Sequence, residues 1–170
     1  LEINPQYADA LVNKGLVYWL LGKPDEAIKI YLKAIKINPN LSIAYRNIGS
    51  AYIDKKEYDQ AIRYLDSAIK LKPTYANAYV GRSLAHYWQG KKEKSVFDIS
   101  EAIRLAPSFD NYIRRAELWG KLKNYDESLK DYSKALELND KNIAVINNRG
   151  STFAFKKDYK SALIDFKKAI

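Results

Sequence analysis

The chain has 170 residues, of which 29% are charged and 47% hydrophobic, and its formal net charge is +9. It contains no cysteine and a single histidine, His86, which excludes disulfides, thiolate metal sites, cysteine nucleophiles and the usual histidine-based catalytic triads. No apolar run approaches the roughly 20 residues of a membrane-spanning helix, so we expect a soluble protein without membrane insertion.

The first part of the chain predicts a pair of helices. Gly22 and Pro24 mark the end of one helix and the start of the next, because glycine often follows a helix and proline often begins one. Pro39 lacks an amide hydrogen and marks the end of the pair. Residues 1–7 are interpreted as the tail of an earlier pair, and the chain as a piece of a longer protein.

The next stretch shows the helical spacing most clearly. Apolar residues recur at three- and four-residue steps from Tyr45 to Tyr52 and again from Tyr58 to Ile69, which predicts two amphipathic helices. The connection, Asp54–Glu57, is polar and short. Such a short link requires the two helices to run antiparallel.

The same pattern continues to the end of the chain with a fixed period. Four prolines stand 34 residues apart: Pro5, Pro39, Pro73 and Pro107. Small residues form a column in the same register, at Gly15, Gly49, Ser83, Ala116 and Gly150. A second column is aromatic or histidine, at Tyr18, Tyr52, His86, Trp119 and Phe153. A period of this length indicates a stacked array of similar units, in which the small residues let helices approach closely.

The first full unit reads Leu11-x-x-Lys14-Gly15-x-x-Tyr18, then Ala27-x-x-x-Tyr31-x-x-Ala34 and Pro39. This pattern recurs five times and resembles the tetratricopeptide repeat family over essentially the whole chain. The resemblance implies an all-α fold, a right-handed superhelical solenoid of antiparallel helix pairs. We predict a single array over 1–170, with the tail at 1–7 and units at 8–41, 42–75, 76–108, 109–142 and 143–170.

A charge pattern of this chain accompanies the repeat. Aspartate follows arginine by 16 residues in three pairs, Arg82 and Asp98, Arg115 and Asp131, and Arg149 and Asp165. The corresponding positions of the first two units hold neither residue of the pair. We predict that each arginine forms an ion pair with its aspartate across the two helices of its unit.

The residues offer little for catalysis. His86 falls in a column of packing residues, no glycine-rich phosphate loop occurs, and carboxylate pairs such as Asp25-Glu26 suit the first turn of a helix. We therefore expect no enzymatic activity, no metal and no cofactor.

The resemblance implies a binding surface instead, because the first helix of each pair lines a concave groove in this family. The predicted peptide-binding groove comprises Asp9, Asn13, Leu16, Trp19, Leu20, Arg46, Asn47, Ser50, Leu84, Tyr87, Trp88, Arg114, Glu117, Asn147 and Asn148. Asparagine amides at Asn13, Asn47 and Asn148 can donate to and accept from a peptide backbone, although solvated polar residues would look the same. The apolar clusters around Trp19 and Trp88 favour binding, with burial between neighbouring first helices as the alternative.

The expected partner is a protein or peptide segment, extended or helical. Chaperone carboxylate tails are not expected. Family members that bind such tails use lysine, asparagine and arginine side chains on three successive first helices, and the matching positions here hold residues such as Val12, Leu16 and Gly81. Two alternatives stay open. One is end-to-end self-association through uncapped apolar ends, and the other is nucleic-acid binding by lysine-rich turns. No residue fixes the compartment, and a cytoplasmic location is favoured over others.

Overall fold

A computed structural model describes residues 5–170, and the described chain contains helices and short connections but no strand. The helices are α1 (Pro5–Leu20), α2 (Pro24–Ile37), α3 (Ser42–Asp54), α4 (Tyr58–Leu71), α5 (Ala76–Trp88), α6 (Lys92–Leu105), α7 (Phe109–Lys121), α8 (Tyr125–Leu138), α9 (Ile143–Phe155) and α10 (Tyr159–Ala169). The predicted all-α class of paired helices is confirmed.

The start of the first helix differs from the sequence prediction. α1 begins at Pro5, so the first helix starts three residues before the predicted unit boundary at residue 8. Proline suits the first turn of a helix because its missing amide hydrogen has no helical partner there. Leu1 to Asn4, the rest of the predicted tail, lie outside the described residues.

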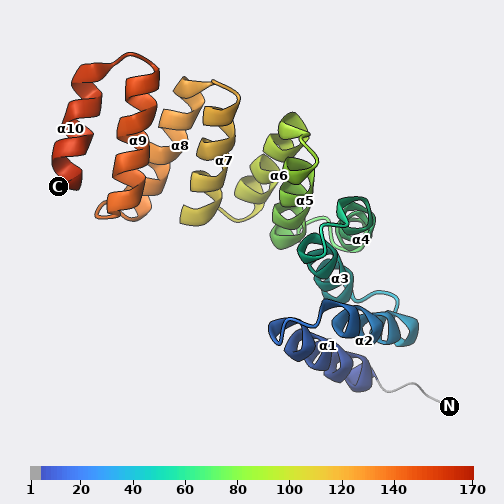
Figure 1. The fold of residues 1–170 in the computed structure, drawn as a ribbon. Helices are drawn as coiled ribbons and strands as arrows, with labels where there is room; N and C mark the ends of the chain where they lie inside the picture. Colours follow the sequence, from blue (N-terminus) through green and yellow to red (C-terminus); the bar gives the residue numbers. More distant parts are fainter. Residues whose placement is uncertain (1–4) are drawn as a thin grey trace. The chain divides into compact units, whose positions relative to one another are not determined.

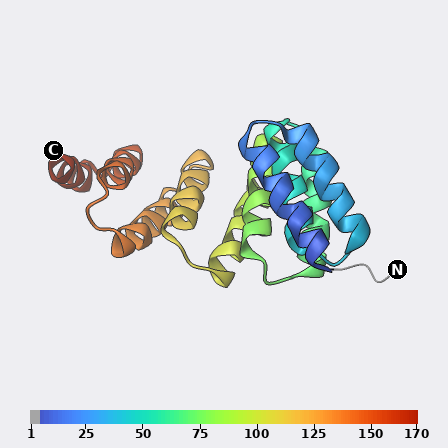
Figure 2. The same cartoon turned by 90° about the horizontal axis from the view of Figure 1, so that it is seen from below.

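The helices form two compact units, Leu1–Asp98 and Ile99–Ile170. In the first unit, α1 packs against α2, α3 against α4, and the contacts of α2 with α3 and of α4 with α5 join the pairs (Figure 1). In the second unit, α7 packs against α8, α8 against α9, and α9 against α10. Seen from below, α1 and α2 of the first unit again lie side by side (Figure 2). Each unit therefore buries its own apolar seam.

Small residues of the predicted column set the distance between the helices of a pair. A Cβ atom at Gly15 would lie 2.5 Å from Tyr31 Cε1, and one at Gly49 would lie 2.6 Å from Leu65 Cγ. Tyr31 and Leu65 are both fully buried. The large side chain of the second helix thus packs directly against the glycine backbone of the first helix. This is the close approach that the column of small residues predicts.

The turn inside each pair uses a left-handed residue. Its φ is 70° at Gly22, 77° at Gly90, 61° at Lys56, 59° at Lys123 and 67° at Lys157. A non-glycine residue in this region carries a steric cost, because its Cβ approaches the neighbouring carbonyl oxygen. Three of the five turns therefore contain a lysine where glycine would relieve strain.

The three predicted arginine–aspartate pairs are confirmed. Arg115 donates to Asp131 from Nε and Nη2, both at 2.7 Å, and Arg149 donates to Asp165 in the same way at the same distances. Arg82 Nε lies 2.9 Å from Asp98 Oδ2, and its Nη2 lies 2.6 Å from Oδ1. All three aspartates are buried, so each pair is a two-point hydrogen-bonded contact shielded from water.

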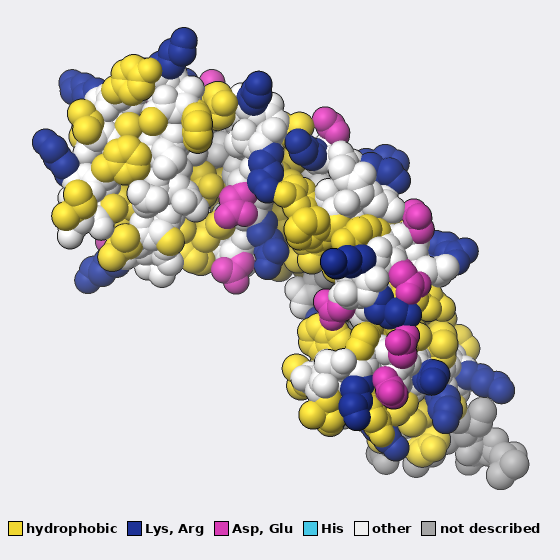
Figure 3. Space-filling view, viewed as in Figure 1, with side chains coloured by type: hydrophobic (Ala, Val, Ile, Leu, Met, Phe, Trp, Pro, Cys, Tyr) yellow, Lys and Arg dark blue, Asp and Glu magenta, His cyan; other side chains and the backbone are white. Residues whose placement is uncertain are grey.

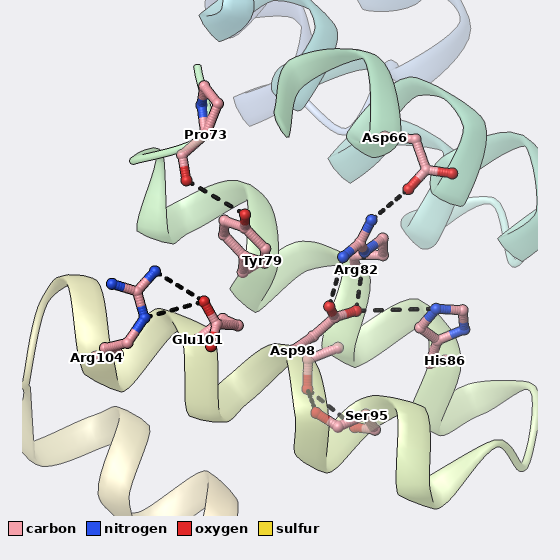
Figure 4. A network of polar contacts seen from close by, with 10 residues as sticks. Asp66, Pro73, Tyr79, Arg82, His86, Ser95, Asp98, Glu101 and Arg104 are labelled. Carbon is pink, nitrogen blue, oxygen red and sulfur yellow. Dashed lines mark hydrogen bonds and ion pairs between the residues drawn. The ribbon is translucent and has the colours of Figure 1, made fainter. Parts of the chain in front are cut away.

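The remaining nitrogen of each arginine reaches a third helix, which the sequence analysis did not predict. Arg82 Nη1 donates to Asp66 of α4 at 2.5 Å (Figure 4). The Nη1 atoms of Arg115 and Arg149 donate to Ser100 and Ser133 at 3.1 and 3.2 Å. One guanidinium on a first helix therefore joins the second helices of its own and the preceding pair.

Candidate functional site

The predicted groove residues of the first unit present a mixed apolar surface. Leu20 of α1 and Trp88 of α5 are 71% and 56% exposed. Tyr87 is half-buried and contacts Trp88 edge to face, with ring centroids 5.1 Å apart. Trp19 is also half-buried, and its indole N–H donates to Asp54 of α3 at 2.5 Å. The exposed members fit a contact surface, whereas Trp19 bridges two first helices of its own chain.

The groove asparagines do not share one environment. Asn13 and Asn147 are exposed and Asn148 is half-buried. Asn47 differs, because it is only 7% exposed and its Oδ1 accepts from Arg46 Nη1 at 3.0 Å. Its side chain also faces the buried phenol of Tyr31 on α2, and this contact acts to lower the pKa of the phenol. The Asn47 amide is therefore buried among side chains of its own chain, whereas the repeat register predicts an amide exposed in the groove.

The side chain of Arg46 on α3 is partly exposed, but one of its nitrogen atoms is buried. Its Nε is buried and has no hydrogen-bond partner in the described chain. Its charge lowers the pKa of the Tyr31 phenol, although burial has the larger effect and raises that pKa overall. Arg46 therefore adds positive charge to the predicted groove of the first unit.

The second unit contains a cavity of about 420 Å³ beside α7, α8 and α9. The residues that line it are Glu117, Gly120, Lys121, Lys123, Tyr125, Ser128, Tyr132, Asn148, Ser151, Thr152 and Phe155. Two of them, Glu117 and Asn148, belong to the predicted groove. A cavity of this size falls in the range of about 300–1,000 Å³ that is typical of ligand sites.

Aromatic side chains form much of the cavity lining. Phe155 is 69% exposed and stacks on Tyr125, with ring centroids 6.1 Å apart and an interplanar angle of 15°. Tyr132, which also lines the cavity, is buried. Burial raises the pKa of Tyr132 to about 12, and the negative charge of Glu117 adds to this effect. The Tyr132 phenol therefore stays neutral at physiological pH.

Sequence reasoning did not predict this cavity, although one signal for it exists. Position 120 stands in the repeat register with Trp19, Ile53 and Tyr87, and it holds glycine. The change from large side chains to glycine within this column is the signal from which the cavity could have been predicted.

Several apolar side chains outside the predicted groove are exposed in the second unit. Hydrophobic side chains gather over α9 and α10 in the space-filling view (Figure 3). The large exposed members on α9, α10 and the chain end are Ile143, Phe155, Tyr159, Leu163, Ile164 and Ile170. Exposed apolar side chains that gather on one part of a surface are typical of an interaction site.

His86 has the environment of a packing residue. Its side chain is mostly buried, and its Nε2 lies 3.8 Å from Asp98 Oδ2 (Figure 4). Its Nδ1 is buried without a partner among the described atoms, and burial lowers its pKa. In residues 5–170, no group of three or more histidine and carboxylate side chains is placed to hold a metal ion.

A family model for the tetratricopeptide repeat matches residues 8–41, 42–75 and 110–142. The chain belongs to the tetratricopeptide repeat family. Proteins of this family are generally scaffolds for interactions with other proteins rather than enzymes. Within the described residues of this tetratricopeptide repeat protein, no helix is both long and apolar enough to cross a membrane.

Solved structures of other tetratricopeptide repeat proteins share the fold. A crystal structure of MamA is 25% identical, with a TM-score of 0.84 and coverage of 91% of both chains. MamA from Desulfovibrio magneticus is 18% identical, with a TM-score of 0.84 and coverage of 95% of this chain and 92% of that one. YrrB, described as having an unusual peptide-binding site, is 18% identical, with a TM-score of 0.79 and coverage of 94% and 83%. No curated protein matches the chain significantly.

Proposed function

We propose that the chain is a non-enzymatic scaffold that binds a peptide segment of a partner protein along the first helices of its repeats. The observation that carries this proposal is the cavity of the second unit, which contains Glu117 and Asn148 of the predicted groove. The exposed Trp88 and Leu20 provide apolar contacts on the first helices of the first unit. The peptide-binding site of the structurally similar YrrB supports the same class of ligand.

The charges favour a peptide over nucleic acid as the ligand. Lysines in the turns are partly neutralised within the chain, because Lys55 pairs with Asp25 and Glu57 and Lys156 pairs with Asp126. Nucleic-acid affinity depends on lysines and arginines that are available to phosphates. The groove also contains acidic residues, such as Glu117, which would repel a phosphate backbone.

A random peptide library, selected on the wild-type protein, tests the proposal. Selected peptides should bind about tenfold more weakly to the double variant Tyr87→Ala with Trp88→Ala, because exposed aromatic side chains commonly dominate binding energy. Phe97→Ala is the matched control, since Phe97 is a similarly exposed aromatic residue on a second helix, α6. Equal losses for the double variant and the control, or the absence of any selected peptide, would refute the groove as the binding surface.

Self-association is the second candidate function. Exposed apolar residues on α1 (Val17) and on α10 (Leu163 and Ile164) could cover one another between copies. Mass measured by light scattering at increasing concentration should then rise, and Leu163→Lys should abolish the rise. A constant monomer mass in the wild type would exclude this function while leaving peptide binding unaffected.

A further inference from the structure

Position 120 of α7 breaks a column of large side chains on the first helices. The equivalent positions of the earlier repeats hold Trp19, Ile53 and Tyr87, and the following repeat holds Ala154. Two members of this column, Trp19 and Tyr87, belong to the predicted peptide-binding groove. The second unit therefore lacks a large side chain where the first unit has three.

Trp19 of the first unit shows what a large side chain at this repeat position contacts. Trp19 lies on α1, and its indole Nε1 donates to Asp54 of α3 at 2.5 Å. It is partly buried and packs against the apolar core that includes Tyr31 and Ile48. An aromatic side chain at this position thus occupies the space between the first helices of two successive pairs.

Gly120 leaves the corresponding space of the second unit open. A Cβ atom at Gly120 would meet no atom closer than Ser128 Oγ, at 3.7 Å. Its φ also lies outside the left-handed region, unlike those of Gly22 and Gly90. Neither close helix packing nor backbone conformation requires glycine here, and the residue lines the cavity of about 420 Å³.

Aromatic side chains line this cavity near the position that corresponds to Asp54. Asp54, the partner of Trp19, lies 35 residues after it, and the residue at the same interval from Gly120 is Phe155. Phe155 is mostly exposed and stacks on Tyr125. Glu117 and Asn148 border the same cavity and offer acceptors for an indole N–H or a phenol O–H.

We propose that the Gly120 cavity binds an aromatic side chain of the partner peptide, placed as Trp19 is placed in the first unit. The ring stacks on the Phe155 and Tyr125 pair, which favours an aromatic over an aliphatic side chain. This inference rests on the proposed function and specifies the chemistry of its ligand. Because Gly120 has no side chain, the cavity stays open for a tryptophan or tyrosine of the partner. In the first unit, the chain's own Trp19 fills the corresponding space.

A substitution that fills the cavity with a side chain of the protein itself tests the proposal. Gly120→Trp should place an indole in the cavity without a backbone clash, whereas the control Gly120→Ala adds only a methyl group and leaves the cavity largely open. Both changes replace glycine within a helix, so neither should lower the thermal stability. The probe is N-acetyl-tryptophanamide, titrated against isotopically labelled protein and followed by the amide shifts of residues 120, 152 and 155, with N-acetyl-leucinamide as the comparison.

Saturable shifts with the tryptophan probe are expected in the wild type and in Gly120→Ala. They should be lost in Gly120→Trp and weakened about tenfold in Phe155→Ala, whose side chain is too exposed to be needed for folding. If Gly120→Trp fails to fold, Gly120→Leu takes its place. Equal shifts with both probes, or undiminished binding to the filled variant, would overturn the proposal.

Peptides selected on the wild type separate this inference from the proposed function. We expect them to share an aromatic residue at one position, and the preference for it to disappear in Gly120→Trp while the Trp88 contribution persists. Selected peptides that bind the wild type and Gly120→Trp with the same sequence preference would refute the aromatic site and leave the scaffold function standing. Failure to select any peptide would refute the scaffold function, whereas the single-residue probe would still decide the cavity.

Discussion

Arg115 on α7 holds Asp131 on α8 through two parallel hydrogen bonds of 2.7 Å. Asp131 is buried, while the Arg115 side chain keeps about a fifth of its surface exposed. Hydrogen bonding to Asp131 raises the pKa of Arg115 in spite of its partial burial. The Arg115 guanidinium therefore stays charged at physiological pH.

Removing one partner of this pair should destabilise the protein strongly. Arg115→Ala leaves the Asp131 carboxylate buried without its cation, and the expected loss of unfolding free energy is about 3 kcal/mol. Asp131→Ala should cost a similar amount, but the double variant should cost clearly less than the two single losses added. Chemical denaturation of the four proteins measures this coupling, and additive losses would show that the pair contributes nothing as a pair.

The left-handed lysines of the turns predict gains in stability. Lys56 has a φ of 61° and an exposed side chain. Lys56→Gly should therefore raise the unfolding free energy by about 1 kcal/mol, because glycine occupies this region without steric cost. The reverse change at the equivalent turn, Gly22→Lys, is the control and should lower stability by a similar amount. Thermal melting curves that move in the opposite directions would contradict this account of the turns.

Replacing either of two glycines on first helices by alanine should change the stability in opposite directions. A Cβ at Gly49 would lie 2.6 Å from Leu65 Cγ and 3.2 Å from the Ala61 carbonyl oxygen, so Gly49→Ala should cost about 1–3 kcal/mol of stability. Gly120→Ala meets no such contact and should gain up to about 1 kcal/mol from its better helix propensity. Denaturation curves of both variants measure the difference. A loss at position 120 as large as that at position 49 would show that Gly120 is a packing glycine.

These glycines also show how far the sequence predicted the structure. The fixed period predicted the helix pairs, the close packing at Gly15 and Gly49, and the pairing of Arg115 with Asp131, because each depends on residues one helix apart in a repeating geometry. The burial of Asn47 was not predictable in this way. It depends on the side chains that surround Asn47, among them the buried Tyr31 of another helix.

The cavity is a second feature that was not predicted from the sequence pattern. A repeat register places Gly120 in its column, but it does not show whether neighbouring side chains close over the missing one. In the structure Phe155 and Tyr125 stack on each other instead of filling the space. Whether a column gap becomes a cavity depends on such side-chain packing, which a sequence pattern does not specify.

The environment of His86 predicts a pH dependence of stability. Burial lowers the pKa of His86 below its ordinary value of 6.5, the negative charge of Asp98 opposes this effect, and the positive charges of Arg82, Lys94 and Lys91 add to it. The unfolded chain therefore binds a proton at His86 more readily than the folded chain does, so stability rises with pH in this range. The contribution of the neutral histidine is fully present above 6.5 and is lost as the pH falls toward the lowered pKa of the folded protein.

His86→Phe removes this dependence with a side chain that the equivalent position, Phe153, already carries. Unfolding free energies of the wild type and the variant, measured by denaturation from about pH 8 to about pH 5, should diverge as the pH falls, with the wild type losing more stability. Asp98 keeps its two hydrogen bonds to Arg82 in the variant, so the comparison isolates the histidine. A wild type that gains stability relative to the variant on acidification would show that the contact with Asp98 outweighs burial and that His86 is protonated in the folded state. Parallel pH profiles would show that folding leaves the pKa of His86 unchanged, and would also contradict the prediction.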